Sequence, residues 1–227
     1  MDVTSARMFL ALAMVSVASF YDIKKREVHD LIWIIFVIPA AILIFFEPNL
    51  FDALKSIGFA MILAPIAILL WRFGFFGAAD ALCLISLVFI APLKTFSEFA
   101  VTPLTPLTNA AIISIIPVMV NFFRNALSCL RSEEIFKDFQ ETKFKKMLAM
   151  FLGYRAKNPK YGFSIEVQEN SVKKFDFSLK NADYTEYCTK PNTWISPGIP
   201  YICYIAAGFV VQLFAGDILA HIFNLKS

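Results

Sequence analysis

Six apolar runs divide this chain, and they constrain its fold more than any other feature. They cover residues 8–21, 31–46, 54–73, 81–93, 107–123 and 199–222. A helix needs about 20 apolar residues to cross a bilayer, and several of the runs approach that length. The 227 residues are 58% hydrophobic with a mean hydropathy of +0.64, a composition that is rare in a water-soluble domain. We therefore expect an all-α polytopic membrane protein with about six transmembrane helices.

The first run ends at Asp22, directly before the basic residues 24–26. A cleaved signal peptide would begin with a basic segment and end at a site of small residues. The sequence shows neither feature around this run. We therefore expect it to be a retained helix, with Asp22 at its end.

The stretch between the fifth and sixth runs has a different composition. Residues 125–193 hold 12 Lys and Arg and 9 Asp and Glu, more than half of the chain's charged side chains. This predicts a small soluble α+β insert at 125–196, preceded by transmembrane helices 1–5 at 1–124 and followed by transmembrane helix 6 at 197–227. Within the insert, apolar residues at helical spacing predict an amphipathic helix over 132–152. Period-two alternation at 163–167 and 175–179 predicts a β hairpin.

The distribution of positive charge predicts an orientation. If all six runs cross the membrane, the segments 22–30, 72–80 and 124–196 lie on one side, which then holds 17 of the 21 Lys and Arg. The positive-inside rule assigns that side to the cytoplasm. We expect a multi-pass protein of the cell membrane with both termini extracellular. The basic insert is explained by a membrane-facing surface, so no nucleic-acid partner is expected.

This orientation brings Asp22 and Asp80 to the same cytoplasmic boundary. Asp80 opens the fourth run, and a carboxylate inside a bilayer costs about 2.5–3.5 kcal/mol at its centre. Asp80 could simply cap a helix, and Asp22 could be an ordinary interfacial acid beside three cations. Two carboxylates brought close together instead tend to share one proton, so that one acts as a base and the other as an acid. We expect residues 77–80 to form a non-helical or frayed entry to the fourth helix.

The two aspartates and their surroundings carry a family resemblance. Asp22 before a basic loop, with Gly77 and Asp80 at Gly-x-x-Asp spacing, resembles the GxGD membrane aspartyl proteases. Within them the pattern is similar to the archaeal preflagellin peptidases of the type IV prepilin peptidase branch. Ala79 replaces the second glycine, which a broader Gly-x-hydrophobic-Asp form of the motif includes. The resemblance implies that Asp22 and Asp80 are the catalytic pair, with Gly77 and Ala79 as motif support.

The resemblance also implies a substrate. It is the leader peptide of a preflagellin or pilin-like precursor, cut at the cytoplasmic membrane face without a cofactor. Three alternatives stay open: a proton-coupled transporter with the two aspartates as relay groups, a presenilin-like intramembrane protease of other substrates, and a scaffold or insertase. The boundary position of both acids and the absence of inverted repeats argue against transport.

Other polar residues are weaker candidates for a site. Asp217, in the last run, is expected to be an interfacial acid, Asp30 to cap the second helix, and His29 to be a solvated loop residue. The chain has only two histidines, and its cysteines lack the paired spacing of a metal site, so zinc is not expected. The four cysteines, expected to be free packing residues, are Cys83, Cys129, Cys188 and Cys203.

Overall fold

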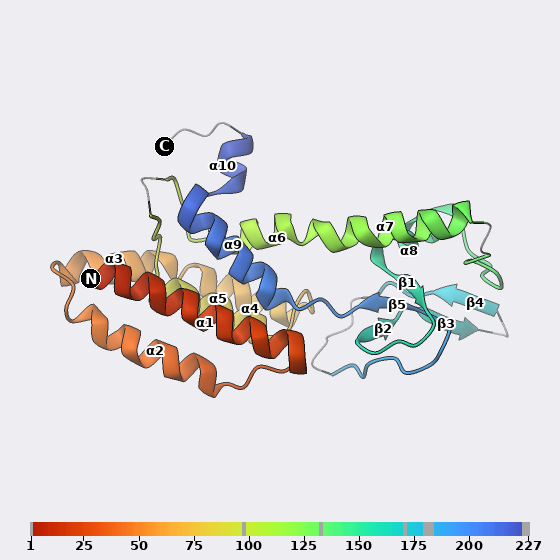
Figure 1. The fold of residues 1–227 in the computed structure, drawn as a ribbon, viewed down its shortest axis with the longest axis horizontal. Coiled ribbons are helices and arrows are strands. Elements are labelled where there is room, and N and C mark those ends of the chain that lie inside the picture. Colours follow the sequence, from red (N-terminus) through yellow and green to blue (C-terminus); the bar gives the residue numbers. More distant parts are fainter. Residues whose placement is uncertain (1, 97–98, 132–133, 170–171, 179–183, 224–227) are drawn as a thin grey trace. The chain divides into compact units, whose positions relative to one another are not determined.

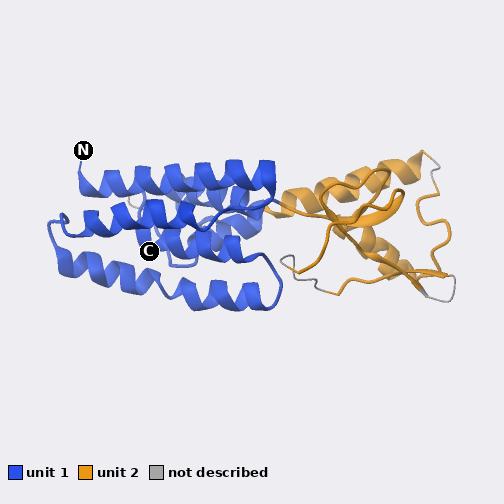
Figure 2. Cartoon of the chain, turned by 90° about the horizontal axis from the view of Figure 1, so that it is seen from below, with its two compact units in different colours: residues 1–113, 200–227 blue, residues 114–199 orange. Residues whose placement is uncertain are grey.

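The computed structural model describes residues 2–96, 99–131, 134–169, 172–178 and 184–223 (Figure 1). The chain forms two compact units, coloured separately in Figure 2. Unit 1 consists of Met1–Ile113 and Pro200–Ser227, and unit 2 of Ser114–Ile199. The boundaries of unit 2 lie outside those predicted for the insert, since this unit includes most of the fifth apolar run.

Unit 1 is helical throughout its described secondary structure. Its helices are α1 (Val3–Lys25), α2 (Leu31–Ile44), α3 (Leu50–Ala60), α4 (Leu63–Arg72), α5 (Ala78–Ile90), α6 (Thr105–Ile113), α9 (Tyr201–Ala215) and α10 (Ile218–Ile222). The Asp2 side chain starts α1 by accepting a hydrogen bond from the N–H of Ser5, 3.0 Å away. The helix ends where Arg26 adopts a left-handed backbone with φ 59°.

Three segments are long and apolar enough to cross a membrane, and they are Val3–Lys25, Leu50–Arg72 and Thr105–Leu130. The helices α2, α5 and α9 are apolar but have only 14, 13 and 15 residues. At 1.5 Å per residue they extend roughly 20 Å, less than the ~30 Å of a hydrocarbon core. The expectation of about six spans is therefore supported for three segments in the described part of the chain.

Prolines account for the breaks in two of these long segments. Pro65 has no N–H to donate to the carbonyl of Met61, and the chain is interrupted between α3 and α4 at that point. Pro117 likewise cannot donate to Ile113, which is the last residue of α6. The sequence placed both prolines inside apolar runs, and each one shortens its helix.

The short helix α5 is the most enclosed element of unit 1. It packs against α1, α2, α3, α4 and α9, and about half of its residues are buried (Figure 1). In contrast, α2 exposes several large apolar side chains, among them Ile35 at 62% and Ile38 at 55%. Exposed apolar faces of this kind are suited to lipid. The inner helix therefore does not need a full span, because other helices surround it.

The entry to α5 differs from the sequence expectation. Residues 77–80 are not a frayed segment, since α5 begins at Ala78 with Gly77 as its N-cap. The Asp80 side chain closes a capping box by accepting the Gly77 N–H at 2.9 Å. The expectation was wrong because this carboxylate satisfies a backbone donor that would otherwise have none, and that stabilises the first turn.

A buried arginine ties α1 to the far end of α5. The side chain of Arg7 is 1% exposed, and its Nη1 lies 3.0 Å from the Glu47 carboxylate. Its Nε and Nη2 donate to the carbonyls of Ile90 and Phe89 at 2.9 and 3.0 Å. These carbonyls belong to the last turn of α5, where no intrahelical donor is available.

Unit 2 combines two helices with two small sheets. Its elements are α7 (Ile115–Leu130), α8 (Lys143–Leu152), β1 (Tyr154–Ala156), β2 (Gly162–Ser164), β3 (Glu166–Glu169), β4 (Val172–Phe175) and β5 (Thr193–Pro197). One antiparallel sheet has the order β1-β5-β2, and β3 pairs antiparallel with β4. The core centres on Trp194, which is fully buried and stacks on Phe136 with ring centroids 5.2 Å apart.

Two details of the predicted insert are corrected. The amphipathic helix expected over 132–152 is limited to α8, whereas residues 135–138 form a turn and Phe139 forms a parallel bridge with Lys173. Asp138 has a positive φ of 73°, which breaks helical geometry, and Thr142 caps α8. Residues 132–133 lie outside the described residues. The antiparallel strand pair is formed by 166–169 and 172–175, because the expected strand 163–167 is divided between β2 and β3. Of the expected strand 175–179, only Phe175 belongs to β4, residues 176–178 form no strand, and residue 179 lies outside the described residues.

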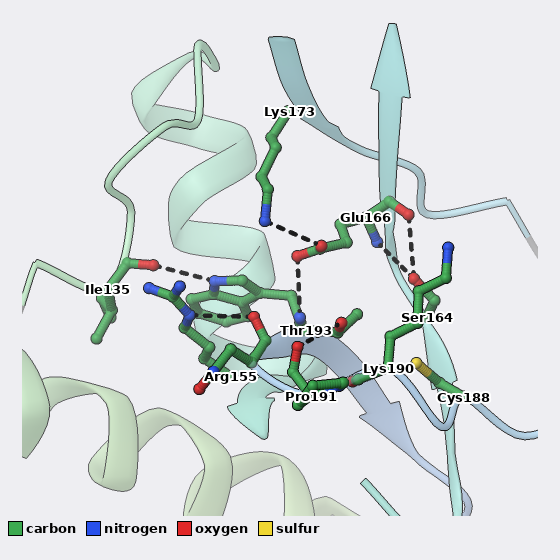
Figure 3. Close-up of polar contacts among 11 residues, drawn as sticks. Ile135, Arg155, Ser164, Glu166, Lys173, Cys188, Lys190, Pro191 and Thr193 are labelled. Carbon is green, nitrogen blue, oxygen red and sulfur yellow. Dashed lines mark hydrogen bonds and ion pairs between the residues drawn. The ribbon is translucent and has the colours of Figure 1, made fainter. Parts of the chain in front are cut away.

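The carboxylate of Glu166 links the two sheets of unit 2. It accepts hydrogen bonds from the backbone N–H of Trp194 at 3.0 Å and from Lys173 Nζ at 3.2 Å (Figure 3). The indole N–H of Trp194 donates to the carbonyl of Ile135, 3.1 Å away. These bonds connect β3, β4 and β5 with the turn segment before α8.

Candidate functional site

Asp22 lies at the C-terminal end of α1 and is half-buried. Its carboxylate interacts with the Arg26 guanidinium and accepts a hydrogen bond from the backbone N–H of Ile202. Its Oδ2 is buried and has no hydrogen-bond partner among the described residues. A buried carboxylate oxygen without a partner is costly, and such positions are often functional.

The Ile202 contact brings the start of α9 into this site. Ile202 is the second residue of α9, where backbone N–H groups have no intrahelical acceptor. Pro200, the N-cap residue, makes no side-chain cap for this helix. The carboxylate of Asp22 therefore supplies from α1 the acceptor that α9 lacks.

Asp80 lies in the first turn of α5, a helix that packs against the Asp22 helix α1, and is half-buried. The Gly77 N–H holds its carboxylate in place at 2.9 Å. Ala79, the second motif position, is partly buried and packs against the core of unit 1. Gly77 has φ −78° and ψ 167°, an ordinary extended conformation, so its role here is that of a helix cap.

Two thiols have both aspartates among their electrostatic neighbours. Cys83 follows Asp80 by one helical turn on α5, and Cys203 lies on α9 with its Sγ 3.8 Å from the carbonyl of Ser19. Each of these thiols lies close enough to both Asp22 and Asp80 to interact with them electrostatically. The two carboxylates therefore lie around the same pair of cysteines, where α1, α5 and α9 pack together.

Aromatic side chains lie at the start of α5 and at the start of α9. The Phe76 ring, just before α5, stacks on Tyr201, the first residue of α9, with centroids 5.7 Å apart and planes 13° from parallel. Tyr204 lies one turn further along α9. Sequence reasoning missed these residues, together with Cys83, Cys203 and the start of α9. The only available signal was the placement of Cys83 three residues after Asp80.

The remaining candidates lie elsewhere. Asp217 is 7% exposed, so it is not an interfacial acid as expected. It accepts a hydrogen bond from Thr105 Oγ1 at 2.6 Å and caps α10. Asp30 occupies the N-cap position of α2 but makes no side-chain cap bond, and His29 is exposed. Among the residues that the structure describes, no group of three or more His, Cys, Asp or Glu could hold a metal.

Known proteins resemble this chain over most of its length. A preflagellin peptidase of Methanocaldococcus jannaschii is 24% identical over 226 residues, covering 91% of this chain and 92% of that protein. A preflagellin peptidase of Methanococcus voltae is also 24% identical, covering 88% and 91%. The chain is similar to the preflagellin peptidases. The resemblance seen in the sequence is thereby confirmed.

A family model adds information about the C-terminal part. Residues 135–218 match the family described as Archaeal Peptidase A24 C-terminus, Type II. The matched segment covers most of unit 2 and the helix α9, and it ends just after Asp217. It includes neither Asp22 nor Asp80, so the assignment of these two residues depends on their own geometry.

Proposed function

We propose that the protein is a membrane aspartyl endopeptidase that removes the leader peptide of preflagellin or pilin-like precursors. The substrate class rests on the two relatives, both of which are preflagellin peptidases. The aspartyl mechanism is supported by the packing of α1 against α5, the two helices that carry Asp22 and Asp80. The thiols of Cys83 and Cys203 also have both aspartates as electrostatic neighbours.

The proposed chemistry divides acid and base roles between the two carboxyl groups. The ionised carboxylate takes a proton from a water molecule as the water oxygen bonds to the scissile carbonyl carbon. The protonated carboxyl donates its proton to the carbonyl oxygen. When the tetrahedral intermediate collapses, the C–N bond breaks and the departing nitrogen takes the proton that the first carboxyl received from water. A hydroxyl proton of the intermediate returns to the second carboxylate, so the pair regains its starting state. Because the proton belongs to the pair, neither aspartate is assigned permanently to one role.

Two features of the site support this assignment. The partnerless Oδ2 of Asp22 is available to bind the shared proton or the attacking water. Asp80 is already bonded to Gly77, which fixes its position at the start of a buried helix. A water-activating pair needs one preorganised carboxylate and a second carboxylate with an oxygen available for the water.

The proposed site of cleavage follows from the boundary position of the aspartates. A precursor with a charged leader and an apolar helix keeps its charges in water and its apolar part in lipid. Its charged–apolar junction then lies at the depth of Asp22 and Asp80, on the cytoplasmic side. Cleavage there leaves the apolar helix on the mature protein. N-terminal sequencing of the product tests this point, since a new terminus inside or after the apolar stretch would contradict it.

The decisive experiment uses purified protein and a leader-bearing precursor. Asp22→Asn and Asp80→Asn are each expected to reduce cleavage by at least about 100-fold, because a carboxamide cannot exchange a proton. Asn retains the hydrogen-bond acceptor that caps α5, so folding should be preserved. Asp217→Asn is the matched control, because it makes the same change at another buried carboxyl of unit 1, and its cleavage rate should stay close to that of the wild type.

Wild-type turnover in either Asn variant would refute the aspartyl mechanism. If no preparation cleaves the precursor, but both Asn variants abolish proton-coupled uptake in vesicles, the transporter alternative would replace the proposal. Equal losses in all three variants would show that the effect comes from folding of unit 1, and the assignment of the catalytic pair would fail.

A further inference from the structure

A polar groove of about 780 Å³ lies on unit 2, far in the sequence from both aspartates. The second half of α7, β1 and the residues that follow β1 contribute to its lining. Among the residues that the structure describes, three cations line it, namely Arg124, Arg155 and Lys157, together with one acid, Glu134. A groove with this excess of positive charge favours a negatively charged ligand.

The net charge of the groove depends on whether acidic side chains pair with its three cations. None of the three forms an ion pair with an acidic residue in the part of the chain that the structure describes. Arg124 lies over the Tyr154 ring, 3.8 Å from its centroid. The Nε of Arg155 donates to the carbonyl of Asn192 at 3.2 Å (Figure 3). Both contacts orient a guanidinium group without cancelling its charge.

The acid of the groove is already paired. Glu134 lies 3.2 Å from Lys137, a cation that is not part of the lining, and both side chains are largely exposed. Glu134 therefore contributes little to balancing the three cations. Ser128, Asn158 and Asn192 complete the lining with neutral groups that can donate hydrogen bonds.

The same helix that supplies Arg124 has an apolar outer surface. Exposed large apolar side chains recur along α7 at spacings of three or four residues, so they share one face. They are Ile116, Val120, Phe123, Leu127 and Leu130. The helix is the second half of the candidate span Thr105–Leu130. Arg124 and Ser128 each follow a residue of this apolar face in the sequence, so they lie at its edge on the helix surface. The groove that they line is therefore next to a surface suited to lipid chains.

We propose that this groove binds the phosphate of an anionic lipid headgroup while the lipid chains lie along the apolar face of α7. Guanidinium groups bind phosphate oxygens through two parallel hydrogen bonds, and a lysine adds a point charge. Basic pockets next to membrane helices bind anionic headgroups through the same chemistry. A free phosphate would satisfy the cations but leave the apolar face without a ligand, so the lipid is the better match.

The test measures lipid binding to full-length protein in detergent by native mass spectrometry, and it does not depend on proteolysis. The probes are dihexanoyl phosphatidylglycerol, dihexanoyl phosphatidylcholine and glycerol phosphate. The variant Arg124→Gln with Lys157→Gln is compared with a charge-matched control, Lys143→Gln with Lys160→Gln, whose two lysines lie outside the groove. We expect the groove variant to bind phosphatidylglycerol at least about tenfold more weakly than the wild type and the control.

Each other outcome would overturn the proposal. Equal binding of phosphatidylcholine would remove the selectivity for an anionic headgroup, and equal binding of glycerol phosphate would show that the groove takes a free phosphate. A groove variant that binds like its control would show that the lipid sits elsewhere. Since Arg124 also packs on Tyr154, a second variant leaves this contact intact. Lys157→Glu should weaken phosphatidylglycerol binding, whereas Lys160→Glu should not.

Discussion

Replacing Arg7 by methionine tests whether the buried arginine holds α1, α5 and the turn after α2 together. The change removes three contacts at once, to Glu47 and to the carbonyls of Phe89 and Ile90. Methionine fills much of the same volume, so the loss is mainly one of charge and hydrogen bonds. The free energy of unfolding of unit 1 should fall.

The magnitude follows from what is left behind. The Glu47 side chain is 9% exposed and would become a buried carboxylate without its cation. Breaking a buried ion pair in this way costs about 3–5 kcal/mol. Removing both charges, in Arg7→Met with Glu47→Gln, leaves only the two carbonyls without a charged donor, which costs about 1–3 kcal/mol. The double variant should therefore be about 2 kcal/mol more stable than the single one.

The assay is equilibrium unfolding of the purified protein in detergent, followed for both variants and the wild type. Arg72→Met is a suitable control, because Arg72 is exposed at the end of α4, and its removal should change stability by less than about 1 kcal/mol. If Arg7→Met loses no more than the control, Arg7 does not carry the stability assigned to it. A double variant as unstable as the single one would refute the role of Glu47.

Three further predictions concern other parts of the chain. Burial acts to raise the pKa of Glu141, but the N–H of Phe175 at 2.9 Å and the nearby Lys145 ammonium lower it below its ordinary 4.5 overall. A depressed pKa means that its stabilisation is complete above pH 4.5 and is lost as the pH falls below that value, so Glu141→Gln should flatten acid unfolding in this window. Trp194→Ala should destabilise unit 2 by about 3–5 kcal/mol in urea titrations followed by circular dichroism. Gly208→Ala should destabilise unit 1 by about 1–3 kcal/mol in thermal unfolding, because its Cβ would lie 2.7 Å from a backbone nitrogen of α6.

For each of these three predictions, one experimental result would contradict it. An unchanged acid-unfolding curve in Glu141→Gln would show that its hydrogen bonds do not stabilise the fold. Native-like stability of the alanine variant at 194 would mean that the core of unit 2 does not depend on this indole. Unaltered stability of Gly208→Ala would require α6 and α9 to separate without cost.

The sequence alone determined the class of the protein and the two carboxylates worth testing. The apolar runs predicted helices in nearly the right places, since α1, α2 and α5 each fall within or close to a run. Asp22 and Asp80 were chosen because a carboxylate at the edge of an apolar run needs a physical reason. The charged composition of 125–193 distinguished a second kind of structure from the apolar helices. All these features are local, so composition and spacing are enough to read them.

Only the tertiary structure decided which helix ends meet. The contact of Ile202 with Asp22, and the approach of Cys203 to Asp80, join residues that are more than 100 positions apart. The strand β5 was missed because it is short and lies between prolines, although its Trp194 forms the core of unit 2. Lipid and protein interior are equally apolar, so hydropathy cannot tell a buried helix such as α5 from one that faces lipid. That distinction depends on packing between segments distant in the sequence, which no local pattern records.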